Sequence, residues 1–171
     1  MELYKTFTCK TAQEVSFEQV FDLIRNDEEL KKNYDHLTSI RGIGIVNASA
    51  MIAYTNNFKN ITTSRKLSSY YGIAPFREQS GTSVNKKAMV KCYSNSMLRA
   101  YLTQAAENTI REHGIYHEYY RRLSNRGKCH GIALNNVKNK LLHLSLSLIA
   151  NDMDYEENHE VLRTIRKAQS A

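Results

Sequence analysis

The sequence predicts a mainly α-helical fold: a helix-hairpin-helix, then a loop-rich segment with a possible short β-hairpin, then a three-helix C-terminal part. Three observations predict it. Apolar residues recur at helical spacing along most of the chain. Only one proline, Pro75, interrupts the 171 residues. The stretch that holds it, residues 73–93, is the least helical part, and a chain of this length is large enough for one domain with a real core.

Two helices are expected before residue 40. Ser16 can cap the first one, whose apolar face is formed by Phe17, Val20, Phe21 and Ile24. The second is expected from about Asp27 to Ser39. It carries acidic residues in its first turn, where the helix dipole favours negative charge.

Residues 37–54 have the form of a helix-hairpin-helix. Gly42 and Gly44 let the hairpin turn tightly and let its backbone approach another molecule closely. Free N–H groups at the start of the second helix would then face a phosphate, with Arg41 beside them. A bulky residue in place of Gly44 would be strained if that glycine has a positive φ. The alternative is an ordinary corner between two helices that needs glycine.

The later elements complete the helical prediction. Ser64 can cap a short helix that stops at Gly72, and helical patterns return at about 94–113, 115–126 and 131–151. The expected organisation is a helical lead-in over 1–35, a main domain over 36–151 and a charged tail over 152–171. The main domain divides into the helix-hairpin-helix at 37–54, a serine loop at 72–93 and the last helices at 94–151.

Positive charge is concentrated in the middle of the chain. Residues 59–140 hold 15 Lys and Arg against 4 Asp and Glu, whereas residues 1–58 and 141–171 each carry a net charge of −2. Such a block attracts a polyanion with salt-sensitive affinity. The tyrosines interleaved with it favour nucleic acid over a membrane, because their rings can offer a hydroxyl to phosphate or a face to a base. The alternative is a basic surface that only keeps the protein solvated.

Several kinds of site are not expected. Three cysteines, far apart and without a CxxC pair, predict neither a zinc ribbon nor a disulfide framework. The longest apolar stretch, residues 141–150, is too short to span a bilayer, so a soluble, cytoplasmic protein without a membrane partner is expected. No metal site or cofactor is expected in this chain. The basic block lacks grouped carboxylates, and His113 and His117 lack a metal-binding spacing.

The loop after Pro75 contains the candidate for covalent chemistry, a Ser-Gly pair at Ser80 and Gly81. A hydroxyl on a turn among cations suits phosphate chemistry, because the positive field stabilises an attacking alkoxide and the charge on a phosphorus transition state. Ser80 is therefore the candidate nucleophile. The candidate phosphate or DNA ligands around it are Arg77, Lys86, Lys87 and Lys91. The alternative is an ordinary Ser-Gly surface turn.

A further candidate phosphate ligand, Arg99, lies one turn inside the next helix, behind the possible N-cap residues Ser94 and Asn95. It can reach back to the Ser80 loop and bind a phosphate through two hydrogen bonds. Alternatively it pairs with Glu107 or with a helix end.

Three tyrosines beside Arg121 and Arg122 suggest a tyrosine recombinase, in which a tyrosine is the nucleophile and arginines bind the phosphate. At helical period Tyr116, Tyr119 and Tyr120 lie on one face with Leu123, which is typical of a core face. The core interpretation is therefore preferred to a tyrosine nucleophile.

One ordered combination of residues lies within a similarity that covers roughly residues 36–150. It consists of Gly42, Gly44, Leu67, Gly72, Pro75, Ser80, Gly81, Lys91, Asn95, Leu98, Arg99, Ala105 and Ala106. This combination resembles the C-terminal transposase domain of the DEDD-type insertion-sequence transposases, relatives of the pilin-gene invertase.

The resemblance implies a DNA-binding and strand-exchange domain that acts in DNA transposition, in which Ser80 joins DNA covalently. It implies a preceding RuvC-like domain with four acidic residues, to which a divalent metal such as Mg would belong. The implied partners are DNA (transposon ends and target), a structured guide RNA and further copies of the chain. The implied location is the bacterial cytoplasm, at the nucleoid.

The sequence departs from the family pattern in three ways. Only about 35 residues precede the hairpin, so the RuvC-like domain is missing and the chain is expected to be a fragment, an excised domain or a decayed element. Without that domain the chain is expected to be inactive alone. Ser94 stands where the family usually has glycine, and Asn139 where it usually has a basic residue.

Two other functions compete with the transposase domain. One is a non-catalytic helix-hairpin-helix module that binds structured DNA or RNA, which needs only the hairpin and the basic face. The other is a structural oligomerisation domain, which needs neither. Catalysis additionally requires that a phosphate can reach Ser80.

Overall fold

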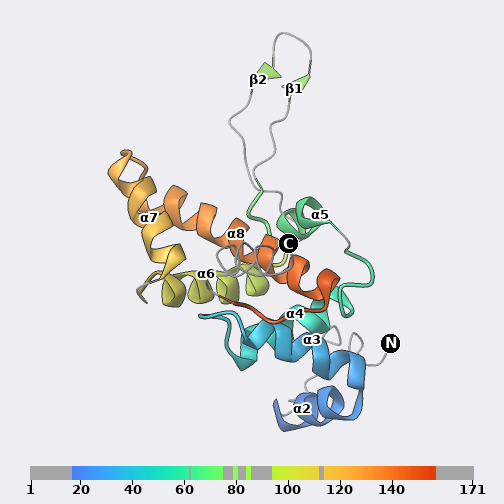
Figure 1. Cartoon of the computed structure of the whole chain (residues 1–171). Helices are drawn as coiled ribbons and strands as arrows, with labels where there is room; N and C mark the ends of the chain where they lie inside the picture. The colour runs from blue at the N-terminus through green and yellow to red at the C-terminus, as the bar shows by residue number, and fades with distance from the viewer. Residues whose placement is uncertain are drawn as a thin grey trace, which may run out of the picture.

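The computed structural model describes residues 17–61, 63–74, 79–80, 84–85, 94–111 and 114–156. Within them the elements are α2 (Phe17–Asn26), α3 (Glu28–Thr38), α4 (Ile45–Thr55), α5 (Ser64–Tyr70), β1 (Gln79–Ser80), β2 (Val84–Asn85), α6 (Ser96–Arg111), α7 (Ile115–Asn125) and α8 (His130–Asn151). Figure 1 shows a mainly helical molecule, which confirms the predicted fold class. The two strands pair antiparallel, with Ser80 opposite Val84.

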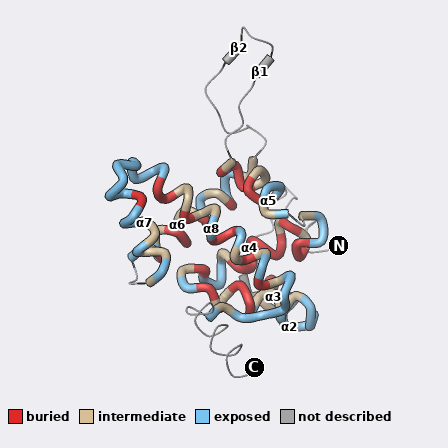
Figure 2. Tube along the Cα trace, turned by 45° about the horizontal axis from the view of Figure 1, so that its top comes forward, coloured by how far each residue is buried: buried red, intermediate tan, exposed pale blue. Residues whose placement is uncertain are grey.

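The long helix α8 lies at the centre and packs against α3, α5, α6 and α7. Its sequence explains this position, because apolar residues recur at helical spacing and are almost fully buried: Ala133, Leu134, Val137, Leu141, Leu142 and Leu148. Figure 2 shows the buried residues gathered where these helices meet. The three-helix C-terminal part predicted from the sequence is thus the framework on which the other elements pack.

Small side chains let α4 approach α6 closely. Ala48 on α4 and Ala105 and Ala106 on α6 are fully buried, and the two helices pack against each other. Isoleucines before and within α4 fill the remaining space: Ile40, Ile43 and Ile52.

The helix starts follow the predicted chemistry with one correction. Asp27 caps α3, since its carboxylate accepts hydrogen bonds from the N–H groups of Glu29 (2.9 Å) and Leu30 (3.1 Å). The cap of α5 is Thr63 and not Ser64, because Thr63 has extended backbone angles and its hydroxyl accepts from the N–H of Lys66. Ser16, the expected cap of α2, lies outside the described residues.

The residues directly after α8 run back along α3, although the sequence predicts a charged tail from residue 152. The imidazole of His36 lies between two carboxylates, with Nδ1 2.7 Å from Asp154 and Nε2 3.1 Å from Asp152. Lys32 forms an ion pair with Asp152, and the hydroxyl of Ser39 accepts from the N–H of Tyr155 (2.8 Å). Residues 152–155 are therefore held to α3 through charged groups.

This attachment makes the stability of the protein depend on pH. Burial disfavours the charged form of His36, but its hydrogen bonds to Asp154 and Asp152 and the charges of both carboxylates outweigh burial and raise its pKa above 6.5. A histidine whose pKa is raised in the folded state stabilises the protein fully at pH values below the pKa that it has in the unfolded state. This stabilisation is lost as the pH rises through the pKa of the folded state.

We therefore expect the melting temperature to fall as the pH rises from about 6.5 through the raised pKa of His36. In the variant His36→Gln the fall should be smaller, because the group that titrates is gone. Thermal unfolding of both proteins across this range measures the difference. Equal pH dependence in the two proteins would contradict the role of His36.

Candidate nucleic-acid interface

The turn between α3 and α4 is docked onto α6 through Gly42. This glycine has φ +89°, a conformation that other residues rarely adopt. A Cβ atom at this position would collide with the Thr109 hydroxyl and lie 2.8 Å from the carbonyl oxygen of Ala105. The Thr109 hydroxyl lies 2.9 Å from the carbonyl oxygen of Arg41 and 2.7 Å from that of Ala105, so it can donate to either. Gly42 is thus required for close packing of the turn against α6.

Gly44 has a different role from Gly42. Its φ is −85°, it is exposed and a Cβ atom there would meet nothing within 4 Å, so the positive φ considered for Gly44 is wrong. Gly44 is the N-cap residue of α4, where no side chain accepts from the first N–H groups and no acidic residue occupies the first turn. These N–H groups and the helix dipole favour an anion at this end of α4.

A shallow depression lies over this turn. It is lined by Thr38, Ser39, Ile40, Arg41, Gly42, Ile43, Gly44, Asn108 and Arg111. Arg41 and Arg111 are both exposed at its surface, one from the turn and one from the end of α6. The structure therefore brings together the three predicted residues of this turn and adds Arg111, which the sequence reasoning did not select.

The two ends of the serine loop are fixed to the helical framework. Before the loop, the carbonyl oxygen of Ile73 accepts from the Asn135 amide (3.1 Å) and the Ser68 hydroxyl donates to Asn139 (2.9 Å). After the loop, the N–H of Asn95 donates to the carbonyl oxygen of Tyr70 (3.0 Å). Asn139, which departs from the family pattern, thus helps to anchor α5 to α8.

One cation, Arg99, lies beside the loop's second anchor, and a second, Lys138, is close enough for the charge of Arg99 to affect it. Arg99 Nη2 donates to the hydroxyl of Ser94 (3.0 Å), the other position that departs from the family pattern. Lys138 Nζ on α8 lies 3.3 Å from the hydroxyl of Thr103, one turn further along α6 than Arg99. Burial and the nearby charge of Arg99 lower the pKa of Lys138, and Glu107 only partly opposes them. An anion beside both side chains would offset the repulsion between these two positive charges.

The remaining predicted residues fall outside this description. The backbone of Ser80 is in β1, but its side chain is outside the described part, as are Arg77, Lys86, Lys87 and Lys91. The convergence of these cations with Arg99 on one phosphate beside Ser80 stays a prediction.

The two candidate regions lie at opposite ends of α6. Arg99 is in its first turn, whereas Thr109, which holds the α3–α4 turn, is near its last. Ten residues of α-helix separate them by about 15 Å along the axis. The α3–α4 turn and the anchored end of the serine loop therefore cannot bind the same phosphate group, but both can contact one extended nucleic acid.

The structure supports neither a tyrosine nucleophile on α7 nor a ligand pocket between α4 and α6. Leu123 is buried, and Tyr116, Tyr119 and Tyr120 are partly buried against the core, as the core interpretation predicts. Burial also raises the pKa of Tyr116, which makes that hydroxyl a poorer nucleophile.

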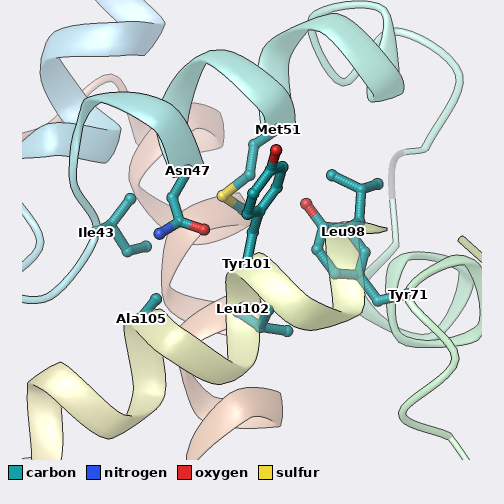
Figure 3. A pocket seen from close by; sticks show the side chains of 8 residues that line it. All are labelled: Ile43, Asn47, Met51, Tyr71, Leu98, Tyr101, Leu102 and Ala105. Carbon is teal, nitrogen blue, oxygen red and sulfur yellow. The ribbon is translucent and has the colours of Figure 1, made fainter. Parts of the chain in front are cut away.

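Figure 3 shows the narrow pocket between α4 and α6, whose lining is mostly apolar and includes Met51, Leu98 and Leu102. It is part of the packing between these helices.

The described residues contain neither a metal-binding cluster nor a membrane-spanning helix. Among them no three His, Cys, Asp or Glu side chains are grouped so that they could hold a metal ion. No helix in the described part of the chain is long and apolar enough to cross a membrane.

The sequence analysis did not select Lys138, although the sequence around this residue indicates that its side chain is partly buried. Lys138 lies four residues after the buried Leu134 and three before the buried Leu141. A lysine at helical spacing between buried leucines must desolvate part of its side chain, so it stands out from the other lysines of the basic block.

The sequence of this chain matches a known protein family and several known proteins. Residues 34–121 match the family described as "Transposase IS116/IS110/IS902 family". The chain is 24% identical over 144 residues to the pilin gene-inverting proteins of Moraxella lacunata and Moraxella bovis, covering 83% of this chain and 45% of each relative. It is 26% identical over 120 residues to an uncharacterized 43.6 kDa protein of insertion element IS110 in Streptomyces coelicolor, covering 70% and 29%.

The chain thus spans less than half the length of these relatives. The matched region begins in α3 and ends in α7, so it includes the α3–α4 turn, the serine loop and Arg99. On this match, the chain belongs to the IS116/IS110/IS902 transposase family.

Proposed function

We propose that this chain is the DNA-binding and strand-exchange domain of a transposase. The observation that carries the proposal is the position of two partly buried cations, Arg99 and Lys138, at the anchored end of the loop that holds Ser80. Family membership over residues 34–121 supports DNA as the substrate. Such a protein would act in the bacterial cytoplasm, at the nucleoid.

In this proposal Ser80 Oγ attacks the phosphorus of a DNA phosphodiester. A bond between Oγ and phosphorus forms, the bond between phosphorus and the leaving deoxyribose oxygen breaks, and that oxygen gains a proton as the serine loses one. Arg99 and Lys138 would neutralise the charge on the phosphoryl oxygens. Attack by a second deoxyribose hydroxyl would reverse these steps, release Ser80 and join a new strand.

The α3–α4 turn would hold the DNA at a distance from the reacting phosphate. Arg41, Arg111 and the first N–H groups of α4 are suited to a backbone phosphate. These features also support the second candidate, a non-catalytic module that binds structured DNA or RNA. The module needs only this turn and the basic face, whereas strand exchange also requires a phosphate at Ser80 and the cations beside the serine loop.

Other components of the reaction follow only from the family resemblance. The described residues group no carboxylates that fit a divalent metal, so we derive no step through a metal in this chain. A RuvC-like domain carrying a metal such as Mg, a structured guide RNA and assembly of several copies remain proposals for the complete protein.

Replacing Lys138 with methionine should weaken DNA binding without destabilising the protein. Methionine keeps the length of the side chain but removes a charge that is partly desolvated and close to Arg99, so the free energy of unfolding should stay level or rise by up to about 1 kcal/mol. The slope of log Kd against log salt should become shallower by about 1, because one phosphate contact is lost.

Titration of labelled duplex DNA at several salt concentrations, together with urea unfolding, tests this prediction. Lys31→Met on the exposed surface of α3 is the matched control and should change neither the salt slope nor the stability. Lower stability with unchanged DNA binding would show that Lys138 is only structural. If the unmodified chain binds no DNA at low salt, the proposed function itself is wrong.

A further inference from the structure

The end of the molecule formed by α7 and the start of α8 carries positive charge that the proposed function does not use. Residues 119–151 contain six Lys and Arg and no Asp or Glu, and the proposed function uses only one of the six, Lys138. Four of the six are exposed, two in the second half of α7 and two in the turn before α8: Arg121, Arg122, Arg126 and Lys128. Figure 1 shows this turn at the opposite side of the molecule from α2. We call these four residues, together with Lys140, the α7–α8 basic surface.

Aromatic contacts hold parts of this surface in place. The guanidinium of Arg122 lies 5.3 Å from the centre of the Tyr119 ring, and Lys140 Nζ lies 5.9 Å from the same centre. The hydroxyl of Tyr120 lies 2.8 Å from His130 Nδ1, which links α7 to the first residue of α8. These contacts reduce the conformational freedom that the cationic side chains would lose on binding.

A shallow depression runs along the exposed side of α7. It is lined by Glu118, Arg121, Arg122, Asn125 and Arg126. Glu118 is the one carboxylate in this lining, and three arginines outnumber it. A depression with this lining suits a row of phosphates, because arginine can donate two parallel hydrogen bonds to each phosphate.

We propose that the α7–α8 basic surface binds the phosphate backbone of duplex DNA, as a second contact away from the serine loop. This inference rests on the proposed function. Duplex DNA is favoured over a single strand because Tyr119 and Tyr120 are partly buried and the Tyr119 ring is already in contact with two cations. The Tyr120 ring also contacts His130 edge-on, so both rings are engaged within the chain, which disfavours stacking on an unpaired base as single-strand binding commonly uses.

The test compares two triple variants with equal charge loss. The first, Arg121→Gln with Arg122→Gln and Arg126→Gln, removes the three arginines of the depression. The matched control, Arg25→Gln with Lys31→Gln and Lys59→Gln, removes three exposed cations from α2, α3 and the turn after α4. Circular dichroism and thermal unfolding should show that both variants stay folded, since all six side chains are exposed.

Binding is measured with a labelled duplex of mixed sequence and with a structured RNA at several salt concentrations. We expect the first variant to lose DNA affinity on the order of tenfold at low salt and its salt slope to become shallower by about 2–3. The control should change much less. A first variant that binds duplex DNA as the control does would overturn the inference while leaving the proposed function intact.

Two other outcomes are also decisive. A loss confined to structured RNA, with duplex binding unchanged, would contradict duplex DNA as the occupant of this surface. A wild-type chain that binds no duplex at all would overturn both this inference and the proposed function. A loss on duplex DNA in the first variant only, with both variants folded, would confirm the α7–α8 basic surface.

Discussion

Replacing Gly42 with alanine should destabilise the protein by about 3–5 kcal/mol. The backbone at this position has φ +89°, which costs an alanine of the order of 1–2 kcal/mol. The new Cβ atom would also collide with the Thr109 hydroxyl and lie 2.8 Å from the Ala105 carbonyl oxygen and 3.0 Å from the Thr109 nitrogen. Since backbone atoms of α6 cannot turn away as a side chain can, the α3–α4 turn would have to separate from α6.

Gly44→Ala is the matched control, because it introduces the same methyl group two residues away. Gly44 has φ −85° and open space around the position of a Cβ atom. The loss of a favourable N-cap residue and the reduced freedom of the unfolded chain oppose each other, so stability should change by less than about 1 kcal/mol. Urea unfolding followed by circular dichroism compares the two variants. Equal stability of Gly42→Ala and Gly44→Ala would contradict the docking of this turn on α6.

The sequence was sufficient to predict most of the helical framework. Apolar residues at helical spacing identified α6, α7 and α8, and the acidic first turn of α3 identified its start. The core interpretation of Tyr116, Tyr119 and Tyr120 was confirmed for the same reason, since their spacing places them on one face with Leu123. These features depend on residues close together in the chain, so a single sequence contains the information.

Local backbone geometry was harder to predict. Thr63 and Ser64 are both good N-cap residues, and only the extended backbone of Thr63 shows which one caps α5. Asn56, Asn57 and Phe58 all have positive φ in the turn after α4. Asparagine tolerates this conformation, but no sequence pattern predicts it for a phenylalanine.

Contacts between distant parts of the chain could not be predicted at all. His36 meets Asp152 and Asp154 across more than 115 residues, and Lys138 meets Thr103 across 35. Of the candidate site, the sequence located the α3–α4 turn, the serine loop and Arg99. It did not show that the turn and Arg99 lie at opposite ends of α6, because that distance depends on how three separate elements pack.

Replacing Ser80 with alanine in a reconstituted full-length enzyme, in which this chain is combined with the RuvC-like domain of the family, should abolish covalent joining of the protein to DNA. Alanine lacks the oxygen that would bond to phosphorus. Binding of DNA should change little, because the cations of the α3–α4 turn and the serine loop remain. Ser83→Ala, three residues further along the same loop, is the matched control and should leave joining intact.

The most direct measurement is the protein–DNA adduct itself. The full-length protein, its Ser80→Ala variant and its Ser83→Ala variant are each incubated with labelled DNA carrying the element's ends. Adducts that survive denaturation are then separated, and the modified peptide is mapped. The account predicts an adduct on the peptide that contains Ser80 in the unmodified protein and in Ser83→Ala, and none in Ser80→Ala. An adduct of undiminished yield in Ser80→Ala, or one mapped to a tyrosine of α7, would contradict it.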